Sequence, residues 1–327
     1  MRFSLMIPVY NAAPYLYDAL EGLRAQTCTD FEALLIDDGS TDESGRICDQ
    51  YAEDDRRFRV WHTDNHGVFA ARQFAEAHAR GEYLLFLDAD DWTDPALLSS
   101  LSGVIDRHHP DLISFDFIVL RADVNTVRET FGENDMFLQG KELEIFYRHL
   151  LSTRYNSLCI KCFHRKLIAC APDYGSFAGL RHGEDLLRSA YLVFGAENLY
   201  YLHRCLYAYR LGTGHSGDFD AQSLRFYERV DAEIFRLLST RVTADDTWRA
   251  LYNDLCRKQF DNYLRLLAGS RLPIAKGSAL LREAMTLPLT QNALSAAEDS
   301  LKYRLLRRSQ FRLLLMLHRG KRWLHAQ

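Results

Sequence analysis

The sequence predicts an α/β fold in which helices flank a mostly parallel sheet, followed by a helical region. Short apolar runs alternate with helical patterns over the first ninety residues, and from about residue 221 the apolar spacing is helical. The chain has 327 residues, 47% apolar and 26% charged, so it can bury a sizeable core. These observations favour one large domain followed by a smaller one.

Four apolar runs predict the first strands, at residues 3–9, 31–36, 58–62 and 83–87. Each run is continuous rather than alternating, as expected for strands that are covered on both faces. Because strands and helices alternate, right-handed crossovers would make these strands parallel. The run at 200–210 predicts a later strand.

Helical patterns separate the four runs. The first covers about residues 12–26, with Asn11 as a candidate N-cap. The second begins at "STDES", where Ser40 and Glu43 have the spacing of a capping box. The third ends before Gly81, which is a suitable C-terminal cap.

Three polar clusters follow predicted strands: "PVYN" (8–11), "DDGS" (37–40) and "DADD" (88–91). Taken singly, each is ordinary turn, cap or loop chemistry. Open α/β sheets, however, bind ligands at the carboxyl ends of their strands. The order and spacing of the three clusters therefore predict one ligand site at that edge.

The stretch "LLFLDADDW" crowds Asp88, Asp90 and Asp91 into four positions after an apolar run. Carboxylates this close repel one another and raise each other's pKa unless a cation or a donor-rich partner neutralises them. The stretch therefore predicts such a partner at the end of this strand.

The charge of the chain is unevenly distributed. The formal net charge of -4 is too small to suggest a nucleic-acid binder, yet the tail at 302–327 carries eight basic residues and no acid. On a helix, the tail arginines would lie opposite the leucines. Two interpretations remain open: the tail lies peripherally on an anionic membrane, or its leucines pack on the protein. The two sets of residues are Arg304, Arg308, Arg312, Arg319 and Arg322 against Leu306, Leu313, Leu314, Leu317 and Leu324.

The seven cysteines are scattered, which fits reduced thiols in a reducing compartment. No stretch reaches the ~18 uninterrupted apolar residues of a spanning helix, and the first residues look like a strand rather than a signal peptide. We therefore expect a cytoplasmic protein. Cys159 and Cys162 form C-x-x-C without a second pair, so a buried strand is favoured there over a zinc site.

Five segments together resemble family-2 inverting glycosyltransferases of the bacterial surface-polysaccharide type, which have the GT-A, nucleotide-diphospho-sugar transferase fold. The resemblance covers about the first 215 residues. It implies a catalytic domain at 1–216, with a nucleotide-binding half at 1–92 and an acceptor-binding half at 93–216. The helical region at 217–327 would pack against this domain or a partner subunit. The segments are "MIPVYNAAPYL", "LLIDDGSTDES", "NHGVFAARQFA", "GEYLLFLDADDW" and "HGEDLLRSA".

The resemblance implies a nucleotide-sugar donor site. Asp38 would bind the uracil ring, since a carboxylate can accept a charge-assisted hydrogen bond from an imide N–H. Pro8 and Tyr10 would line the base pocket, and Arg72 would lie near the nucleotide or its phosphates. Gln73 departs from the asparagine that is usual in the family. The full set of expected donor-binding residues is Pro8, Tyr10, Asn11, Asp38, Gly39, Arg72, Asp88, Ala89 and Asp90.

The resemblance also implies a divalent cofactor, Mn²⁺ or Mg²⁺, which would bridge the two phosphates of the donor. Such hard cations take oxygen ligands and can assist the departing diphosphate as Lewis acids. Asp90 is the expected direct ligand, and Asp88 would reach the ion through water or face the ribose. Asp91 and His215 are further candidates.

The catalytic base is expected in the Glu184-Asp185 pair at the head of a helical pattern. Asp185 would take the proton of the acceptor hydroxyl, with Glu184 as second choice or as an acceptor contact. After the strand at 200–210, the loop with His215 and Ser216 would close over the phosphates, together with Tyr209 and Arg210 before it.

The sequence therefore predicts a metal-dependent inverting glycosyltransferase. It would move one sugar from a nucleotide donor, a UDP-sugar, to a glycan or lipid-linked glycan acceptor in surface-polysaccharide synthesis. Two alternatives stay open: an inactive nucleotide-sugar-binding scaffold or regulatory subunit, and a nucleotidyltransferase of related fold. The glycine-rich, basic loop typical of the latter is missing from "PVYNAAPYL".

Overall fold

The computed structural model divides into two compact units, which are described separately. The α/β unit comprises Met1–Tyr147 and Tyr155–Thr213, and the helical unit comprises Arg148–Arg154 and Gly214–Gln327. The structure describes residues 1–120, 126–128, 132–153, 155–170, 177, 180, 182–211, 219–242 and 246–324.

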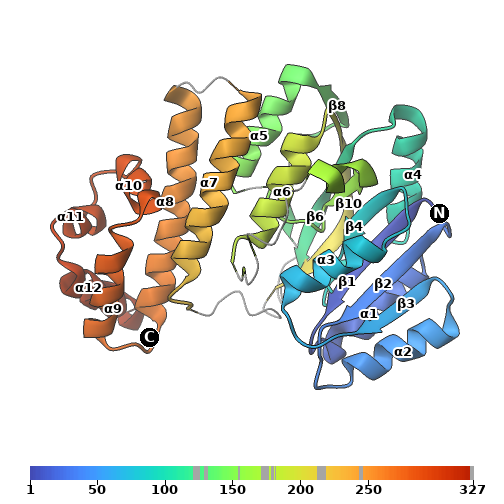
Figure 1. The fold of residues 1–327 in the computed structure, drawn as a ribbon, viewed down its shortest axis with the longest axis horizontal. Helices are drawn as coiled ribbons and strands as arrows, with labels where there is room; N and C mark the ends of the chain where they lie inside the picture. The colour runs from blue at the N-terminus through green and yellow to red at the C-terminus, as the bar shows by residue number, and fades with distance from the viewer. Residues whose placement is uncertain are drawn as a thin grey trace. The chain divides into compact units, whose positions relative to one another are not determined.

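The described residues of the α/β unit form one ten-stranded sheet (Figure 1). Its order is β3-β2-β1-β4-β9-β6-β10-β5, with β7 on β6 and β8 on β10. The strands are β1 (Phe3–Val9), β2 (Phe31–Asp37), β3 (Phe58–His62), β4 (Tyr83–Phe86), β5 (Trp92–Thr93), β6 (Leu112–Leu120), β7 (Thr126–Arg128), β8 (Met136–Gln139), β9 (Lys161–His164) and β10 (Asn198–Arg210).

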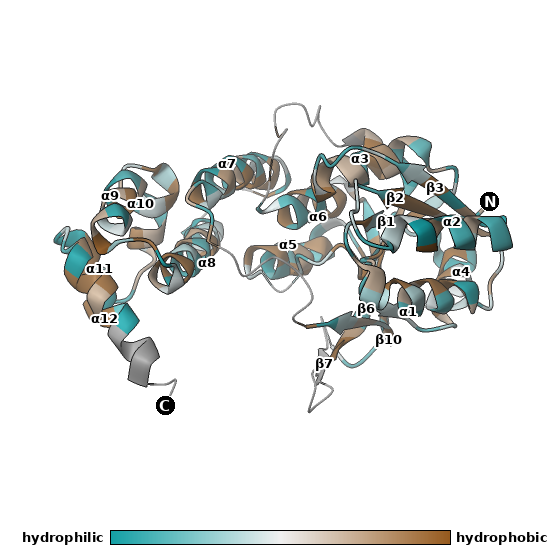
Figure 2. Ribbon diagram, turned by 90° about the horizontal axis from the view of Figure 1, so that it is seen from below, coloured by the Kyte–Doolittle hydropathy of each residue, from teal (hydrophilic) through white to brown (hydrophobic). Residues whose placement is uncertain are grey.

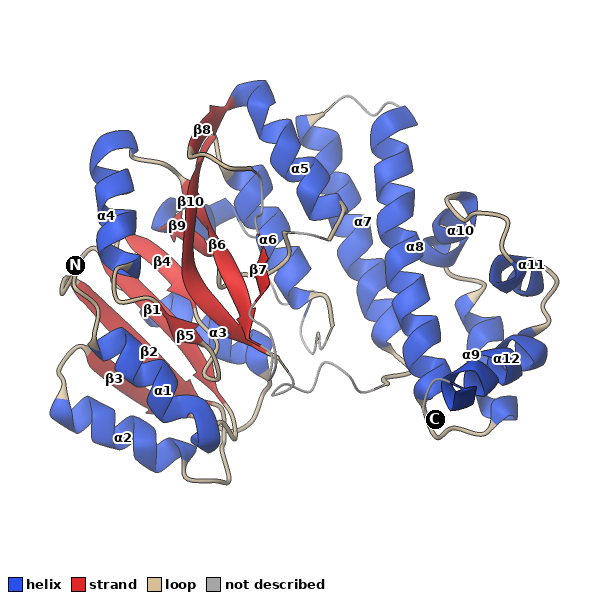
Figure 3. Ribbon diagram, turned by 180° about the vertical axis from the view of Figure 1, so that it is seen from behind, coloured by secondary structure: helices blue, strands red, loops and turns tan. Residues whose placement is uncertain are grey.

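Helices flank this sheet, so the predicted α/β fold is confirmed (Figure 3). The four predicted amino-terminal strands are present, each within one residue of its expected bounds. They run parallel, whereas β9 is antiparallel to β4 and β6. The helices are α1 (Ala13–Arg24), α2 (Ser44–Asp54), α3 (Val68–His78), α4 (Leu97–His108), α5 (Glu144–Leu151) and α6 (Glu184–Gly195), with short 3₁₀ helices η1 (Gly140–Leu143) and η2 (Arg165–Cys170).

The predicted N-cap of α1 is wrong. Ala12 occupies the cap position, and Asn11 adopts a left-handed backbone conformation with φ 49°. The amides at the start of α1 instead donate to Ser44 Oγ at 2.8 Å and to Asp42 Oδ2 at 3.1 Å. Side chains from the next βα loop therefore cap this helix.

The predicted capping box of α2 is also wrong. The helix begins at Ser44, so Glu43 is its N-cap position and Ser40 lies outside it. Glu43 makes no side-chain capping bond there. The short segment between β2 and α2 turns back toward the loop after β1 before the helix begins, which shifts the start of the helix by one turn.

Gly81 does not cap α3, which ends at His78. A Cβ atom at Gly81 would lie 2.4 Å from the backbone nitrogen of Ser4. The glycine is needed because the chain passes directly against β1 as it enters β4.

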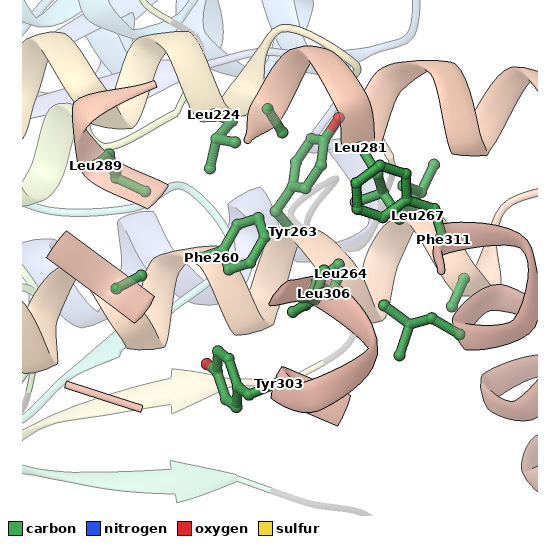
Figure 4. Close-up of a cluster of buried hydrophobic side chains, with 14 of the residues drawn as sticks. Leu224, Phe260, Tyr263, Leu264, Leu267, Leu281, Leu289, Tyr303, Leu306 and Phe311 are labelled. Atoms are coloured by element: carbon green, nitrogen blue, oxygen red, sulfur yellow. The ribbon is translucent and has the colours of Figure 1, made fainter. Parts of the chain in front are cut away.

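The helical unit has an apolar core around α8, which Figure 4 shows in close-up. Phe260 and Tyr263 from α8 pack there with Leu224 from α7. The helices are α7 (Ser223–Arg241), α8 (Asp246–Gly269), α9 (Ile274–Ala284), α10 (Pro288–Ser295), α11 (Leu301–Arg307) and α12 (Phe311–Leu324).

The tail is not the single amphipathic helix that the leucine and arginine spacing predicts. A left-handed residue, Ser309 with φ 55°, separates α11 from α12. The break rotates the two halves, so Leu306 and Leu314 are buried while Leu313 and Leu317 are exposed. None of the helices that the structure describes has the length and apolar character required to cross a membrane.

Arg319, expected on the solvent face of the tail, instead contacts the end of α8. Its guanidinium donates to the backbone carbonyls of Ala268, Ser270 and Leu272, the last at 2.7 Å. The bond to Ala268 satisfies a carbonyl group in the last turn of α8, and the other two bonds hold the segment between α8 and α9.

Candidate active site

The sheet brings the three predicted polar clusters to one edge of the α/β unit (Figure 1). β1 lies between β2 and β4 and runs parallel to both. The register pairs Val9 with Asp37 and Met6 with Phe86, so the three strands end close together. The clusters follow directly, at the edge where open α/β sheets bind ligands.

Hydrogen bonds join the loop after β1 to the loop after β2. The backbone N–H of Asn11 donates to Ser40 Oγ at 3.1 Å, and the backbone N–H of Thr41 donates to Asn11 Oδ1 at 2.8 Å. Beside these bonds, Tyr10 is exposed and Pro8 is partly buried. These hydrogen bonds hold the two loops together.

Asp38 is buried and holds the loop that leads into α3. Its Oδ1 accepts the His66 N–H at 2.9 Å and its Oδ2 accepts the Gly67 N–H at 2.8 Å. Next to it, Gly39 has φ 72°, and a Cβ there would lie 2.9 Å from the backbone nitrogen of Asn65. Only glycine suits this position, because both the conformation and the space exclude a side chain.

Asp91 is anchored by the strand β10. Its Oδ1 accepts the Arg210 backbone N–H at 2.7 Å, and its Oδ2 accepts the hydroxyl of Tyr207. The same hydroxyl accepts the Asp88 N–H at 3.3 Å. Burial, together with the charge of Asp88, raises the pKa of Asp91 to about 8. Asp91 therefore shapes the acidic turn. Tyr209, on the same strand β10, is exposed.

Asp88 and Asp90 are the more accessible carboxylates of the turn, and Ala89 between them is buried. Asp88 Oδ1 accepts a hydrogen bond from Arg72 Nη2 at 3.0 Å. Burial raises the pKa of Asp88, and the Arg72 charge partly offsets this. The backbone carbonyl of Asp90 accepts Arg210 Nε at 3.0 Å, which fixes the turn from its other side.

The chemistry of Asp88 and Asp90 fits a hard divalent cation. Among the residues the structure describes, no group of three or more His, Cys, Asp or Glu side chains is arranged to hold a metal ion. Magnesium characteristically uses only one or two carboxylates and completes its coordination with substrate phosphates. His215 and Ser216 lie outside the described residues.

Arg72 links the acidic turn to the predicted base. From α3, its Nη2 contacts Asp88, its Nη1 donates to Asp185 Oδ1, and Glu184 Oε1 lies 3.8 Å from the same nitrogen. Burial lowers the pKa of Arg72, but the three carboxylates outweigh it and the net shift is upward. Its buried Nε has no hydrogen-bond partner among the described residues.

The two acids at the head of α6 differ in exposure. The Asp185 side chain is 41% exposed and that of Glu184 is 17% exposed. Burial and the neighbouring charge of Asp185 raise the pKa of Glu184. Gly183 precedes them with φ 85°, which lets the chain turn sharply into the helix. Asp185 is therefore the more accessible of the two.

Sequence reasoning missed a buried lysine near this site. Lys161 in β9 donates through Nζ to the carbonyls of Tyr155, at 2.7 Å, and Ser157. Burial lowers its pKa to about 7, although the charge of Asp185 opposes that shift. The signal was present in "CIKCF", because a lysine inside an apolar strand must find partners when buried.

A model of glycosyl transferase family 2 matches residues 4–175. The uncharacterized glycosyltransferase EpsJ of Bacillus subtilis is 28% identical over 207 residues, 63% of this chain and 60% of EpsJ. The glycosyltransferase GlyA of Streptococcus pneumoniae is 26% identical over 93% of this chain and 40% of its own length. The chain thus spans about 60% of EpsJ and less of GlyA.

Solved structures share the fold. Staphylococcus aureus TarS 1–349 in complex with UDP-GlcNAc has a TM-score of 0.71 at 19% identity, covering 99% of this chain and 92% of that one. A mannosyltransferase from Pyrobaculum calidifontis in complex with GDP-Man and Mn²⁺ has a TM-score of 0.51 at 16% identity, covering 97% and 86%. The family model covers more than half of the residues, and the sheet has the architecture of these transferases. The chain belongs to glycosyl transferase family 2.

Proposed function

We propose that this protein is a metal-dependent inverting glycosyltransferase. It transfers a single sugar from a UDP-sugar to a glycan or lipid-linked glycan acceptor in surface-polysaccharide synthesis. The observation that carries the proposal is the contact of one buried guanidinium, Arg72, with both the acidic turn at Asp88 and the accessible carboxylate of Asp185. The UDP-GlcNAc complex of TarS supports the donor class.

The donor would bind across the loops after β1 and β2. Tyr10 and Pro8 would contact the base, and Asp38 would accept the imide N–H of uracil. Asn11 and Gly39 shape these loops, which their mutual hydrogen bonds hold in place before the donor arrives. Preorganised loops lose less conformational entropy on binding, which favours affinity.

Asp90, with Asp88, would hold Mn²⁺ or Mg²⁺ at the acidic turn. When bound, the ion offsets negative charge on the departing nucleoside diphosphate. We assign Asp91 to the turn itself, because its carboxyl group bonds to β10 and its raised pKa, about 8, disfavours the ionised form that a cation requires.

Asp185 would accept the proton of the acceptor hydroxyl. Its Oδ1 is engaged by Arg72, which leaves Oδ2 to take the proton. Glu184 is less exposed than Asp185, so we assign it a contact with the acceptor rather than the proton transfer.

Substitution Asp185→Asn tests this assignment. We expect transfer to fall by about 10²- to 10⁴-fold, because a positioned base is lost. Calorimetric titration of UDP with Mn²⁺, and again with EDTA, should show metal-dependent binding that the variant retains. Unchanged transfer would sink the mechanism. Metal-dependent UDP binding without transfer by wild type, with any UDP-sugar and acceptor tried, would favour the inactive scaffold.

We further propose that α12 makes peripheral contact with an anionic membrane. Leu313, Met316 and Leu317 are exposed on this helix, and Arg308 and Arg312 are exposed nearby. Figure 2 shows that α12 contains both apolar and polar residues. Such a surface suits anionic lipid headgroups above an apolar interior.

The membrane proposal is tested by co-sedimentation with phosphatidylcholine vesicles that contain or lack phosphatidylglycerol. We expect binding only to the anionic vesicles, weakened by salt and by Leu313→Ser with Leu317→Ser. Absence of binding to anionic vesicles at low salt would exclude the proposal.

A further inference from the structure

A buried ion pair lies beside the contact that joins Arg72 to Asp185. Arg188 Nη1 on α6 contacts Glu76 Oε1 on α3 at 2.6 Å, with side chains 2% and 10% exposed. Glu76 lies one helical turn after Arg72, and Arg188 lies about one turn after Asp185. Two ion pairs of opposite polarity therefore connect α3 and α6.

Arg188 also contacts residues next to the acidic turn. Its Nη2 donates to the Phe69 carbonyl at 3.3 Å, and its guanidinium carbon lies 5.4 Å from the ring centre of Phe86. Phe86 is the last residue of β4, and the acidic turn follows shortly after it. Arg188 is thus in contact with both elements from which Arg72 and Asp88 extend.

Stability does not explain this pair. A buried ion pair is often no more stabilising than an apolar pair of similar volume, because both charges lose their hydration. Burial raises the pKa of Glu76, and the charge of Arg188 offsets that shift only partly. An ion pair with fixed donors also defines the relative orientation of its two side chains. Arg188 bonds Glu76 in one geometry, whereas apolar side chains can slide past one another.

We propose that Glu76 and Arg188 are positioning residues that hold the first turns of α6, and with them Asp185, at the active site. This inference rests on the proposed role of Asp185 as the base. The order of the charges matters, because exchanging Glu76 and Arg188 would place like charges one turn apart on each helix.

The test replaces both partners with apolar residues of similar size, Glu76→Leu with Arg188→Met. We expect amide hydrogen exchange at residues 187–190 to become about tenfold faster, since the helix end is no longer fixed. The Kd for UDP with Mn²⁺ should stay within about threefold of wild type. Unchanged exchange at these amides would overturn the proposal.

A control removes a more exposed ion pair of the same unit, Arg2 with Asp106, which joins the chain start to α4. Arg2→Met with Asp106→Leu should leave exchange in α6 unchanged. If the Glu76 and Arg188 double variant fails to fold, Arg188→Lys keeps the charge but loses the planar fork. It should then give the same local acceleration, and unchanged exchange would again overturn the proposal.

Kinetic measurements distinguish a positioning role of Glu76 and Arg188 from a purely structural one. In the double variant, kcat should fall by about 10- to 100-fold while KM for the donor changes little, because a base displaced by about 1 Å loses that much rate. An equal loss of kcat in the Arg2 and Asp106 control would overturn the proposal. If the double variant shows faster exchange but the wild type transfers no sugar, the positioning contact is supported and the proposed function is refuted.

Discussion

The two units bury charge in different ways. In the α/β unit, two buried arginines, Arg72 and Arg188, contact acidic partners around one edge of the sheet. The core of the helical unit is almost wholly apolar (Figure 4). Between α7 and α8 that unit nevertheless buries one carboxyl group, Asp231, whose partners are Gln259 and Cys256.

This difference is what we expect if the α/β unit carries the active site and the helical unit supports it. Burying a charge costs free energy unless it is paired, so charges persist inside a protein where a function requires them. The α/β unit concentrates them around Asp88 and Asp185, and the helical unit depends on apolar packing. In the helical unit we therefore expect truncation of a core side chain to lower stability strongly. We expect replacement of Asp231 to change stability by an amount that depends on pH.

Phe260→Ala should give the largest loss of stability. Phe260 is fully buried in the helical core, so truncation loses transfer free energy and leaves a cavity. We expect a loss of about 3–5 kcal/mol in the free energy of unfolding, measured by urea denaturation. Leu313→Ala on the exposed side of α12 is the control. Equal losses in the two variants would show that the core in Figure 4 is not packed as described.

Asp231→Asn should stabilise the protein, and only above acidic pH. Burial raises the pKa of Asp231 to about 7. The folded state therefore holds a proton that the unfolded state releases, so wild-type stability falls as the pH rises from about 4 to about 7. Asparagine does not titrate, so the variant keeps its stability as the pH rises. Its free energy of unfolding should exceed that of wild type by about 4 kcal/mol at pH 8 and equal it at pH 4.

The measurement is urea denaturation of both proteins at several pH values. The introduced asparagine keeps a side-chain oxygen that can accept the Gln259 Nε2 hydrogen bond, which measures 2.9 Å to Asp231 in the wild type. Stability curves that run parallel over the whole range would contradict the raised pKa.

Tyr207→Phe should have a smaller effect on stability and a specific one on the acidic turn. The variant removes a hydroxyl that donates to Asp91 and accepts the Asp88 N–H. Leaving these buried groups unpaired costs about 1–3 kcal/mol. We expect weaker Mn²⁺-dependent UDP binding in calorimetry. Tyr200→Phe, on the same strand, removes a hydrogen bond to Asp135 outside the acidic turn and is the control. Equal effects in both variants would argue against a special role of Tyr207.

Leu313→Ser with Leu317→Ser should have the smallest effect on stability, within about 0.5 kcal/mol, because both side chains are exposed. Thermal unfolding without vesicles is the measurement. A large loss would mean that these leucines pack against something, which would remove them from the proposed membrane contact.

Local features were predictable from the sequence and long-range ones were not. Buried strands are continuous apolar runs, so β1 matches the prediction at both ends. The bounds of β3 also match, although only Phe58 of this edge strand is buried. The N-cap prediction for α1 was wrong because the side chains that bond its first amides, Asp42 and Ser44, lie after the next strand of the chain. The break at Ser309 carries no glycine or proline to signal it.

The same limit applies to the site. The residue types and spacing in "DADD" indicated an acidic turn, and the sheet order placed it beside the other two clusters. The contact between Arg72 and Asp185 depends on how α3 and α6 meet, which neither segment encodes alone. Lys161 was visible as a charge in an apolar strand, but its partners are loop carbonyls that only the fold brings near.

The position of β9 has a consequence for how the protein is made. This short strand lies between β4 and β6, pairing His164 with Tyr83 and Phe163 with Leu112. A nascent chain leaving the ribosome can assemble the local β1–β4 layer early, but β4 then stays an open edge until residue 164 has been synthesised. Open edges template aggregation, and such distant pairings form slowly. Production of this protein should therefore respond to slower synthesis or to chaperones more than its final stability suggests.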